Sequence, residues 1–259
     1  MGRKHYRSSL IVAAALALSF APIASGRAQY DKSGDGFLFG KPAGTLTLRL
    51  GYDLANANSE VYQTQRRDLT IGSRGFDGLT FGLDVGVPTT QRIDLGFTVD
   101  GNTRSRQSEY RAWEDNNNQP ITQRTTLSMV ALSLNLRYNL YDRGREISNF
   151  AWIPSSYLPY VGIGGGFQYY QLEQKGDFVD FSSVNKDINT DRLFTDGWGK
   201  VGQAFVGVQR NVTPHVDLTV EGRYTLSTAD LHQDYDDPSL GGKINLSGFA
   251  FTVGTTIRF

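Results

Sequence analysis

The chain ends with residues 248–259, GFAFTVGTTIRF, in which large apolar residues alternate with small or polar ones. One face of this segment holds Phe249, Phe251, Val253, Ile257 and Phe259. The other face holds alanine, threonine, glycine and arginine. A period of two residues is typical of a β-strand with one apolar face. About ten residues are enough for a tilted strand to cross a bilayer, so the segment predicts a membrane-spanning strand.

Seven earlier segments repeat this alternation. They lie at 45–54, 79–87, 92–100, 128–141, 159–171, 198–210 and 215–226. Segment 198–210 is the least regular, because Phe205 falls on its polar face. Since eight is an even number, an antiparallel sheet of these segments can close on itself and leave no unpaired edge, as lipid requires. The sequence therefore predicts an all-β fold, a closed antiparallel eight-stranded transmembrane β-barrel.

The connections between these segments differ in length. Tight turns are expected near 87–92 and 211–214. Four connections are long and polar, at 55–78, 101–126, 172–197 and 227–246. This asymmetry predicts long extracellular loops and mostly short periplasmic turns. The connection 142–158 breaks the pattern, since it belongs on the short side but has 17 residues, and the sequence suggests only a position along the barrel base or the membrane surface.

The first 28 residues are typical of a secretory signal peptide. Arg3, Lys4 and Arg7 form a positive start, and residues 10–24 form an apolar run that is too short to span a bilayer. An N-terminal anchor helix is the alternative. The expected domains are a signal peptide at 1–28, a flexible leader at 29–43 and the barrel at 44–259. Cleavage after Ala28 removes four bases and no acid from a chain with 26 of each, which leaves a net charge of −4.

Composition argues against several classes of protein. Without cysteine there are no thiolate metal sites, cysteine nucleophiles or disulfide scaffolds. Equal numbers of acidic and basic residues argue against a strongly basic nucleic-acid-binding protein. A mean hydropathy of −0.36 argues against a helical membrane protein. The 29 glycines and the 12% of aromatic residues are typical of a β-protein with many turns.

Alternation alone does not separate a membrane barrel from a soluble barrel with an aliphatic interior, such as a lipocalin. Two observations favour an apolar outer face. The polar faces of the strands carry charges of both signs, and aromatic residues gather near strand ends as two girdles would. The predicted girdle residues are Tyr52, Tyr138, Tyr169, Trp198, Tyr224 and Phe249.

The C-terminus carries a family resemblance. Gly254, Ile257 and the terminal Phe259 resemble the C-terminal insertion signal of bacterial outer-membrane proteins. The stretch 159–166, PYVGIGGG, and the pattern over 44–259 are similar to the small barrel family that includes the transmembrane domain of OmpA, OmpX, OmpW and the opacity proteins. The resemblance implies a place in the outer membrane of a Gram-negative-type bacterium, among outer-membrane lipid and lipopolysaccharide. It also implies escort by periplasmic chaperones and insertion by the barrel assembly machinery.

The polar faces of the strands place charges inside the predicted barrel. The expected lumen charges are Arg49, Asp84, Glu221 and Arg223 near mid-barrel, with Arg92, Asp94, Arg137, Asp217 and Arg258 nearer the periplasmic end. An eight-stranded barrel is just wide enough for its own side chains, and charges taken out of water need partners. Glycines such as Gly82 and Gly254 are expected to leave room for the long side chains. The near balance of sign predicts a salt-bridged plug, and the alternative is a gated path for small ions or solutes.

No other motif predicts chemistry. Residues 31–36, DKSGDG, match the start of a calcium loop, but its twelfth position is Pro42 instead of glutamate, so no metal and no cofactor are expected. The aspartates of the third and fourth long loops predict solvated acidic loops. After the signal peptide the only histidines are His215 and His232, and neither stands beside a nucleophile.

These observations predict a non-enzymatic outer-membrane protein with a structural or surface-interaction role. Its long loops are expected to contact a ligand or partner that the sequence does not identify, and nucleic acid is not expected as a partner. A narrow porin-like channel is the first alternative. A lipid-modifying outer-membrane enzyme is a more remote one.

Overall fold

The computed structural model describes residues 37–72, 74–115, 118–148, 151–179 and 187–259. The predicted signal peptide, the leader up to residue 36 and the calcium-like motif at 31–36 lie outside the described residues. Among the described residues, no helix has the length and apolar content that a bilayer crossing needs.

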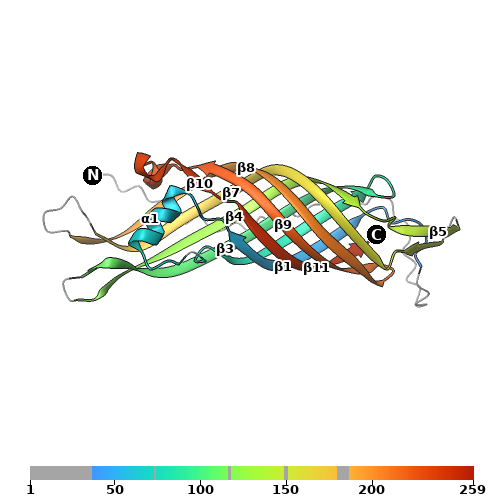
Figure 1. The fold of residues 1–259 in the computed structure, drawn as a ribbon, viewed down its shortest axis with the longest axis horizontal. Coiled ribbons are helices and arrows are strands. Elements are labelled where there is room, and N and C mark those ends of the chain that lie inside the picture. Colours follow the sequence, from blue (N-terminus) through green and yellow to red (C-terminus); the bar gives the residue numbers. More distant parts are fainter. Residues whose placement is uncertain (1–36, 73, 116–117, 149–150, 180–186) are drawn as a thin grey trace, which may run out of the picture. The chain divides into compact units, whose positions relative to one another are not determined.

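Eight long strands form an antiparallel ring. They are β1 (Thr45–Ala55), β2 (Gly78–Pro88), β3 (Ile93–Glu114), β4 (Pro120–Asn139), β7 (Tyr157–Val179), β8 (Ile188–Thr213), β9 (Val216–Asp230) and β11 (Gly248–Arg258). Each strand pairs with two neighbours, β1 with both β2 and β11, and the β8–β9 pair completes the ring (Figure 1). The predicted all-β class and the eight antiparallel strands are confirmed.

The remaining elements are short and lie at the two ends of the ring. They are α1 (Glu60–Asp68), β5 (Gly144–Ser148), β6 (Ala151–Pro154), the 3-10 helices η1 (Gln233–Tyr235) and η2 (Pro238–Leu240), and β10 (Lys243–Asn245). We call the end at which β1 begins and β11 ends the terminal end. The opposite end, which carries α1, η1 and η2, is the loop end.

Successive side chains of each strand point alternately out of the ring and into it. Outward Leu50 and Phe81 are 64% and 56% exposed, whereas inward Arg49 and Asp217 are 4% and 0% exposed. Monomeric soluble proteins rarely expose an apolar belt of this extent, and the hydrocarbon of a bilayer is the solvent that matches it. The ring is therefore a transmembrane β-barrel with an apolar outer face, and the lipocalin-like alternative is excluded.

Two connections that were predicted as long loops are largely strand. The β3–β4 pairing continues beyond the expected strand ends to Glu109 opposite Thr122, where the register shifts. The β7–β8 pairing continues to Val179 opposite Ile188. The two hairpins extend past the rest of the ring at the loop end (Figure 1). Both faces of these extensions are mostly polar, apart from a few buried apolar residues such as Leu127 and Leu172, so the hydrophobic alternation that indicates a strand stops where the wall leaves the apolar belt.

The helix α1, which the sequence did not predict, closes a gap in the wall at the loop end. β1, β2 and β11 are shorter than the other strands, and the chain around α1 spans the space that they leave. On one side Asn56 N–H donates to Ser247 O at 2.9 Å, and on the other Thr70 N–H donates to Glu109 O at 2.9 Å. With nine mostly polar residues, α1 shows too little apolar periodicity to be recognised.

Beneath α1 the ring contains an apolar core. It joins the inner face of α1 to the inward faces of β4, β7 and β9. We call α1 and this core the loop-end cap; the core comprises Ala57, Val61, Tyr62, Leu69, Ile71, Phe76, Leu127, Met129, Tyr170, Leu172, Ala229, Leu231, Tyr235, Ile244 and Leu246. Burial raises the pKa of Tyr62 and of Tyr235 above the ordinary tyrosine value, so both phenols stay protonated.

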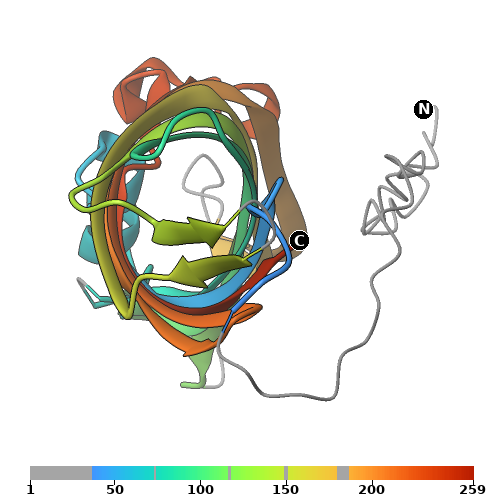
Figure 2. The same cartoon turned by 90° about the vertical axis from the view of Figure 1, so that its right-hand side faces the viewer.

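The connection 142–158 lies at the barrel base, which is one of the two positions that the sequence suggested. It forms the β5–β6 hairpin, which crosses the opening of the ring in the view along its axis (Figure 2). Trp152 is buried, and its backbone forms two hydrogen bonds with the backbone of Leu38. Leu38 N–H donates to Trp152 O at 2.8 Å, and Trp152 N–H donates to Leu38 O at 2.9 Å. The Arg258 guanidinium carbon lies 5.8 Å from the centroid of the Trp152 ring. The hairpin therefore covers the terminal end of the lumen.

The cap yields a test. Tyr62→Ala removes a side chain that is 1% exposed, and we expect it to destabilise the cap by about 3–5 kcal/mol. Since the strand pairs of the ring do not involve Tyr62, the shift in mobility of the unboiled protein on a gel should persist while proteolysis in 55–78 accelerates. Tyr141→Ala, at a 62% exposed position of the terminal end, is the control. Unchanged protease resistance in Tyr62→Ala would contradict this account of the cap.

Candidate functional site

A layer of five charged side chains crosses the centre of the lumen. Arg49 contacts Asp84 at 2.5 Å, Asp100 at 2.8 Å and Glu221 at 3.2 Å. Arg223 contacts Glu221 at 2.9 Å, Asp100 at 3.0 Å and Asp84 at 3.6 Å. Each guanidinium therefore contacts all three carboxylates. We call these five residues the central layer; four of them were predicted to lie together near mid-barrel, and Asp100 completes the set.

Strand register and glycine make room for the layer. Arg49 on β1 stands opposite Gly82 on β2 and Gly254 on β11. A Cβ atom on Gly82 would lie 2.6 Å from Asp100 Oδ1 and 2.7 Å from Arg49 Nη2. A Cβ atom on Gly254 would lie 2.9 Å from Arg49 Cγ. These two glycines therefore leave the space that the arginine fills, as the sequence predicted.

Uncharged groups satisfy the rest of the layer. The Tyr160 hydroxyl donates to Glu221 Oε2 at 2.8 Å, and Arg223 Nη1 donates to Gln203 Oε1 at 3.0 Å. The Phe205 ring centroid lies 4.6 Å from the Arg223 guanidinium carbon. Phe205, which interrupts the alternation of its strand, therefore points into the lumen, where a cation contacts its ring.

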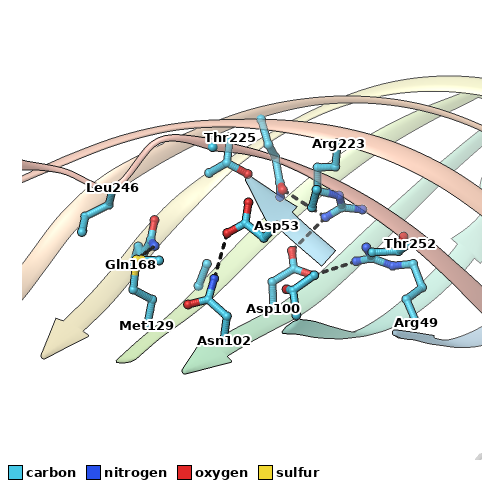
Figure 3. A pocket seen from close by; sticks show the side chains of 15 residues that line it. Arg49, Asp53, Asp100, Asn102, Met129, Gln168, Arg223, Thr225, Leu246 and Thr252 are labelled. Atoms are coloured by element: carbon cyan, nitrogen blue, oxygen red, sulfur yellow. Dashed lines mark hydrogen bonds and ion pairs between the residues drawn. The ribbon is translucent and has the colours of Figure 1, made fainter. Parts of the chain in front are cut away.

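Two small cavities of about 50 Å³ each adjoin the layer. One cavity lies on each side of the layer, and Arg49 and Arg223 line both cavities. Figure 3 shows the cavity toward the loop end, with Asp53 and Asn102 on its wall. Since a water molecule needs about 10–15 Å³ of such space, each cavity holds only a few waters.

A separate ion pair lies between the central layer and the loop-end cap. Arg104 is paired with Asp53, and Asn102 Nδ2 donates to the same Asp53 oxygen at 3.1 Å. The Arg104 side chain is 2% exposed. The sequence missed Arg104 because it falls in the predicted loop 101–126, which is strand in the structure.

Further pairs fill the lumen near the terminal end. Asp94 contacts Arg143 at 2.9 Å and Arg137 at 3.8 Å, and Arg258 contacts Asp217 at 2.5 Å. Arg143 was not predicted, since it comes from the connection 142–158. The other four were predicted here. Charges therefore meet in pairs or small groups along the whole interior.

Arg92 was predicted in the lumen but does not lie there. It precedes the first residue of β3, in the β2–β3 turn, so the strand alternation does not set its direction. Its guanidinium contacts Asp142 at 2.7 Å, and the two side chains are 47% and 57% exposed. The pair is a surface ion pair of the terminal end.

The predicted girdle residues lie on the outer face. Tyr169 and Trp198 pack with ring centroids 5.3 Å apart, and the Tyr169 hydroxyl donates to Asp196 at 2.7 Å. The other girdle residues are exposed: Tyr52, Tyr138, Tyr224 and Phe249.

The three residues of the predicted insertion signal belong to β11 and the residue after it. Ile257 and Phe259 are exposed on the outer face, where Phe259 packs over Gly44, and Gly254 faces Arg49. The structure gives their positions; their role as an insertion signal stays a prediction.

The loop end carries several acidic side chains and His232. Among its described residues, no three His, Asp or Glu side chains are grouped to hold a metal ion. Two of the aspartates here accept backbone hydrogen bonds, Asp234 from Phe194 N–H at 2.9 Å and Asp237 from Ser239 N–H at 2.8 Å. Hydrogen bonds from Ser239 hold the pKa of Asp237 below its usual value.

The sequence matches no protein-family model and no curated protein. Solved structures give distant likenesses. The outer membrane protein OprG of Pseudomonas aeruginosa is 13% identical over 85% of this chain and 98% of its own, with a TM-score of 0.44. A major outer membrane protein of Thermus thermophilus is 9% identical over 84% and 100%, with a TM-score of 0.44. The outer membrane protease OmpT of Escherichia coli is 13% identical over 88% and 100%, with a TM-score of 0.35. The barrel assignment made above stands on the strand pairs and the apolar outer face.

The central layer predicts the effect of breaking a buried ion pair. Arg223→Gln or Glu221→Gln leaves partners unpaired where the side chains are 4% and 5% exposed, and we expect about 3–5 kcal/mol of destabilisation. Arg92→Gln is the matched control, since its exposed pair contributes at most about 1 kcal/mol. Thermal unfolding followed by the gel shift measures the difference. Equal midpoints for the three variants and the parent protein would refute the structural role of the layer.

The glycine spacing gives a second test. Gly82→Ala places a methyl group within 2.7 Å of both Arg49 and Asp100, so the central layer must move. We expect destabilisation of about 1–3 kcal/mol, as for an overpacked core. Gly202→Ala on β8 is the control, because no atom lies within 4 Å of its added Cβ. Equal unfolding temperatures for the two variants would show that the layer tolerates the added group.

Proposed function

We propose that this protein is a non-enzymatic outer-membrane barrel with a structural or surface-interaction role and a lumen that does not conduct. The observation that carries the proposal is the central layer, in which two guanidinium groups contact three carboxylates across the whole width of the interior. A path for ions would have to break several of these contacts at once. The cap and the β5–β6 hairpin add obstacles at each end.

The proposal places the terminal end in the periplasm and the loop end outside the cell. Short turns join β2 to β3 and β8 to β9 at the terminal end, where the connection 142–158 is the exception, and the other long connections lie at the opposite end, as in outer-membrane barrels. Export by a signal peptide over 1–28, periplasmic chaperones and insertion by the barrel assembly machinery belong to the same proposal. Phe259 at the end of β11 would serve as the insertion signal.

The surface role falls to the hairpins and loops of the loop end. The β3–β4 and β7–β8 hairpins extend the wall beyond the apolar belt, and the loop-end cap has a packed apolar core. Such a platform offers polar edges and loop tips to molecules outside the cell. Neither His215 nor His232 stands directly beside a serine or threonine in the sequence, which supports a role without catalysis.

A narrow channel remains the second candidate, and one observation favours it. A small cavity lies on each side of the central layer, so only the layer separates them. A rearrangement of Arg49 and Arg223 would join the two.

Planar-bilayer conductance separates the two candidates. After the gel shift of the unboiled protein has shown that the barrel is folded, we expect no discrete current steps at any holding potential, because the central layer blocks the lumen. Liposome swelling with small sugars should be equally silent. Reproducible single-channel steps would overturn the proposal and make the central layer the filter of a channel.

A further inference from the structure

Three basic side chains stand side by side on the outer face of the wall. In the strand register Lys175 of β7 lies directly opposite Arg124 of β4 on one side and Arg192 of β8 on the other. Lys175 and the exposed Phe167 are an even number of residues apart on β7, so both point outward. All three basic side chains belong to exposed residues. We call Arg124, Lys175 and Arg192 the cation row.

The cation row is unfavourable by itself. Like charges at directly opposite strand positions repel each other and destabilise a sheet. Of the three residues in the row, only Arg192 has a carboxylate partner within the described part of the chain, Glu173 at 2.8 Å. The next position along the row, on β3, is the uncharged Gln107. With three cations and one carboxylate, the row keeps a net charge of +2, which an anion from outside would neutralise.

The cation row also has a defined side and height. The outward faces of β1, β2, β9 and β11 carry no lysine or arginine, so the charge is confined to one part of the wall. On β7, Lys175 lies six residues beyond the girdle residue Tyr169 toward the loop end. For a strand that rises 3.3 Å per residue and is tilted by 40°, this places it roughly 15 Å above the girdle.

That height selects the ligand. Phospholipid headgroups extend only about 5–8 Å beyond the hydrocarbon, so their phosphates lie below the row. A glycolipid with several sugars extends further from the membrane. We propose that the cation row binds phosphate groups on the saccharide headgroup of a glycolipid in the outer leaflet. This inference rests on the proposed function, because it needs the loop end to face outward.

The chemistry of the three side chains fits phosphate. Guanidinium presents a planar fork that binds two oxygens, and ammonium is a compact charge with three donors. Glu173 accepts from Arg192 at 2.8 and 2.9 Å and so fixes one side of the row. Arg124 and Lys175 have no ion-pair partner in the described part of the chain, and their donors are available to the ligand.

The test uses the full mature chain refolded in detergent and in vesicles. Two forms of one glycolipid serve as probes, the phosphorylated form with its core sugars and the same lipid after enzymatic removal of its phosphates. The test variant is Arg124→Gln with Lys175→Gln. The matched control is Arg145→Gln with Lys243→Gln, which removes the same charge from exposed positions on β5 and β10. The parent protein and the control should bind the phosphorylated form, and the test variant roughly thirtyfold more weakly.

Thermal unfolding gives a second readout that separates binding from structure. Without glycolipid, the test variant should unfold at the same temperature as the parent or higher, because repulsion within the row is removed. Phosphorylated glycolipid should raise the unfolding temperature of the parent and the control but not that of the test variant. A test variant that unfolds earlier than the parent without glycolipid would assign the row a structural role and overturn the inference.

Further results would separate the glycolipid assignment from its alternatives. Equal affinity for the dephosphorylated lipid, equal shifts with inorganic phosphate alone, or tighter binding of a sulfated oligosaccharide would each overturn the glycolipid assignment. Failure of the proposed function looks different, because current steps would then appear in the parent, the control and the test variant alike. Binding that is equal in all three proteins, together with a silent lumen, would overturn the cation row alone.

Discussion

Charged side chains are buried away from water at the centre of the lumen, and the need to pair them is the constraint on which the rest of the structure depends. A guanidinium buried without partners is strongly unfavourable, and Arg49 and Arg223 have side chains that are 2% and 4% exposed. Three carboxylates from β2, β3 and β9 surround them. Because these contacts need a fixed strand register, and Arg49 also needs the two glycines that stand opposite it, the charged interior sets the positions of the wall around it.

The two ends of the barrel solve a different problem, which is how to close a polar interior to its surroundings. At the loop end the wall is uneven, and α1 with its apolar core fills the space above the three short strands. At the terminal end the β5–β6 hairpin lies across the opening, with Trp152 against Arg258. An ionic layer, an apolar cap and a hairpin therefore follow one another along a single axis. The outer surface divides in the same way, since an apolar belt gives way to polar hairpins with the cation row.

The sequence predicted those parts of the molecule that obey a period of two residues. Eight strands, their apolar outer face and four members of the central layer follow from alternation, because the bilayer makes outward positions apolar. The alternation of apolar and polar residues no longer indicates strands where the wall leaves the membrane and both of its faces meet polar surroundings. Arg104 lies in a strand extension with polar residues on both faces, and it was assigned to a loop. Arg92 lies in a turn, where alternation no longer fixes direction. The helix α1 is too short and too polar to show a period, and its place in the wall depends on long-range contacts that no local pattern carries.

The central layer has a consequence for the order in which the barrel assembles. The hairpins β3–β4 and β7–β8 join neighbouring parts of the chain and can form early, whereas the β1–β11 seam brings together residues as far apart as Thr47 and Thr256, which are 209 positions apart. The layer draws on both kinds of strand, since Arg49 belongs to the seam and Asp100 to a hairpin. An open sheet would therefore lack the contacts that join the two sides, from Arg49 to Glu221 and from Arg223 to Asp84 and Asp100. Joining the seam therefore also completes the central layer, which disfavours partly closed forms within the membrane.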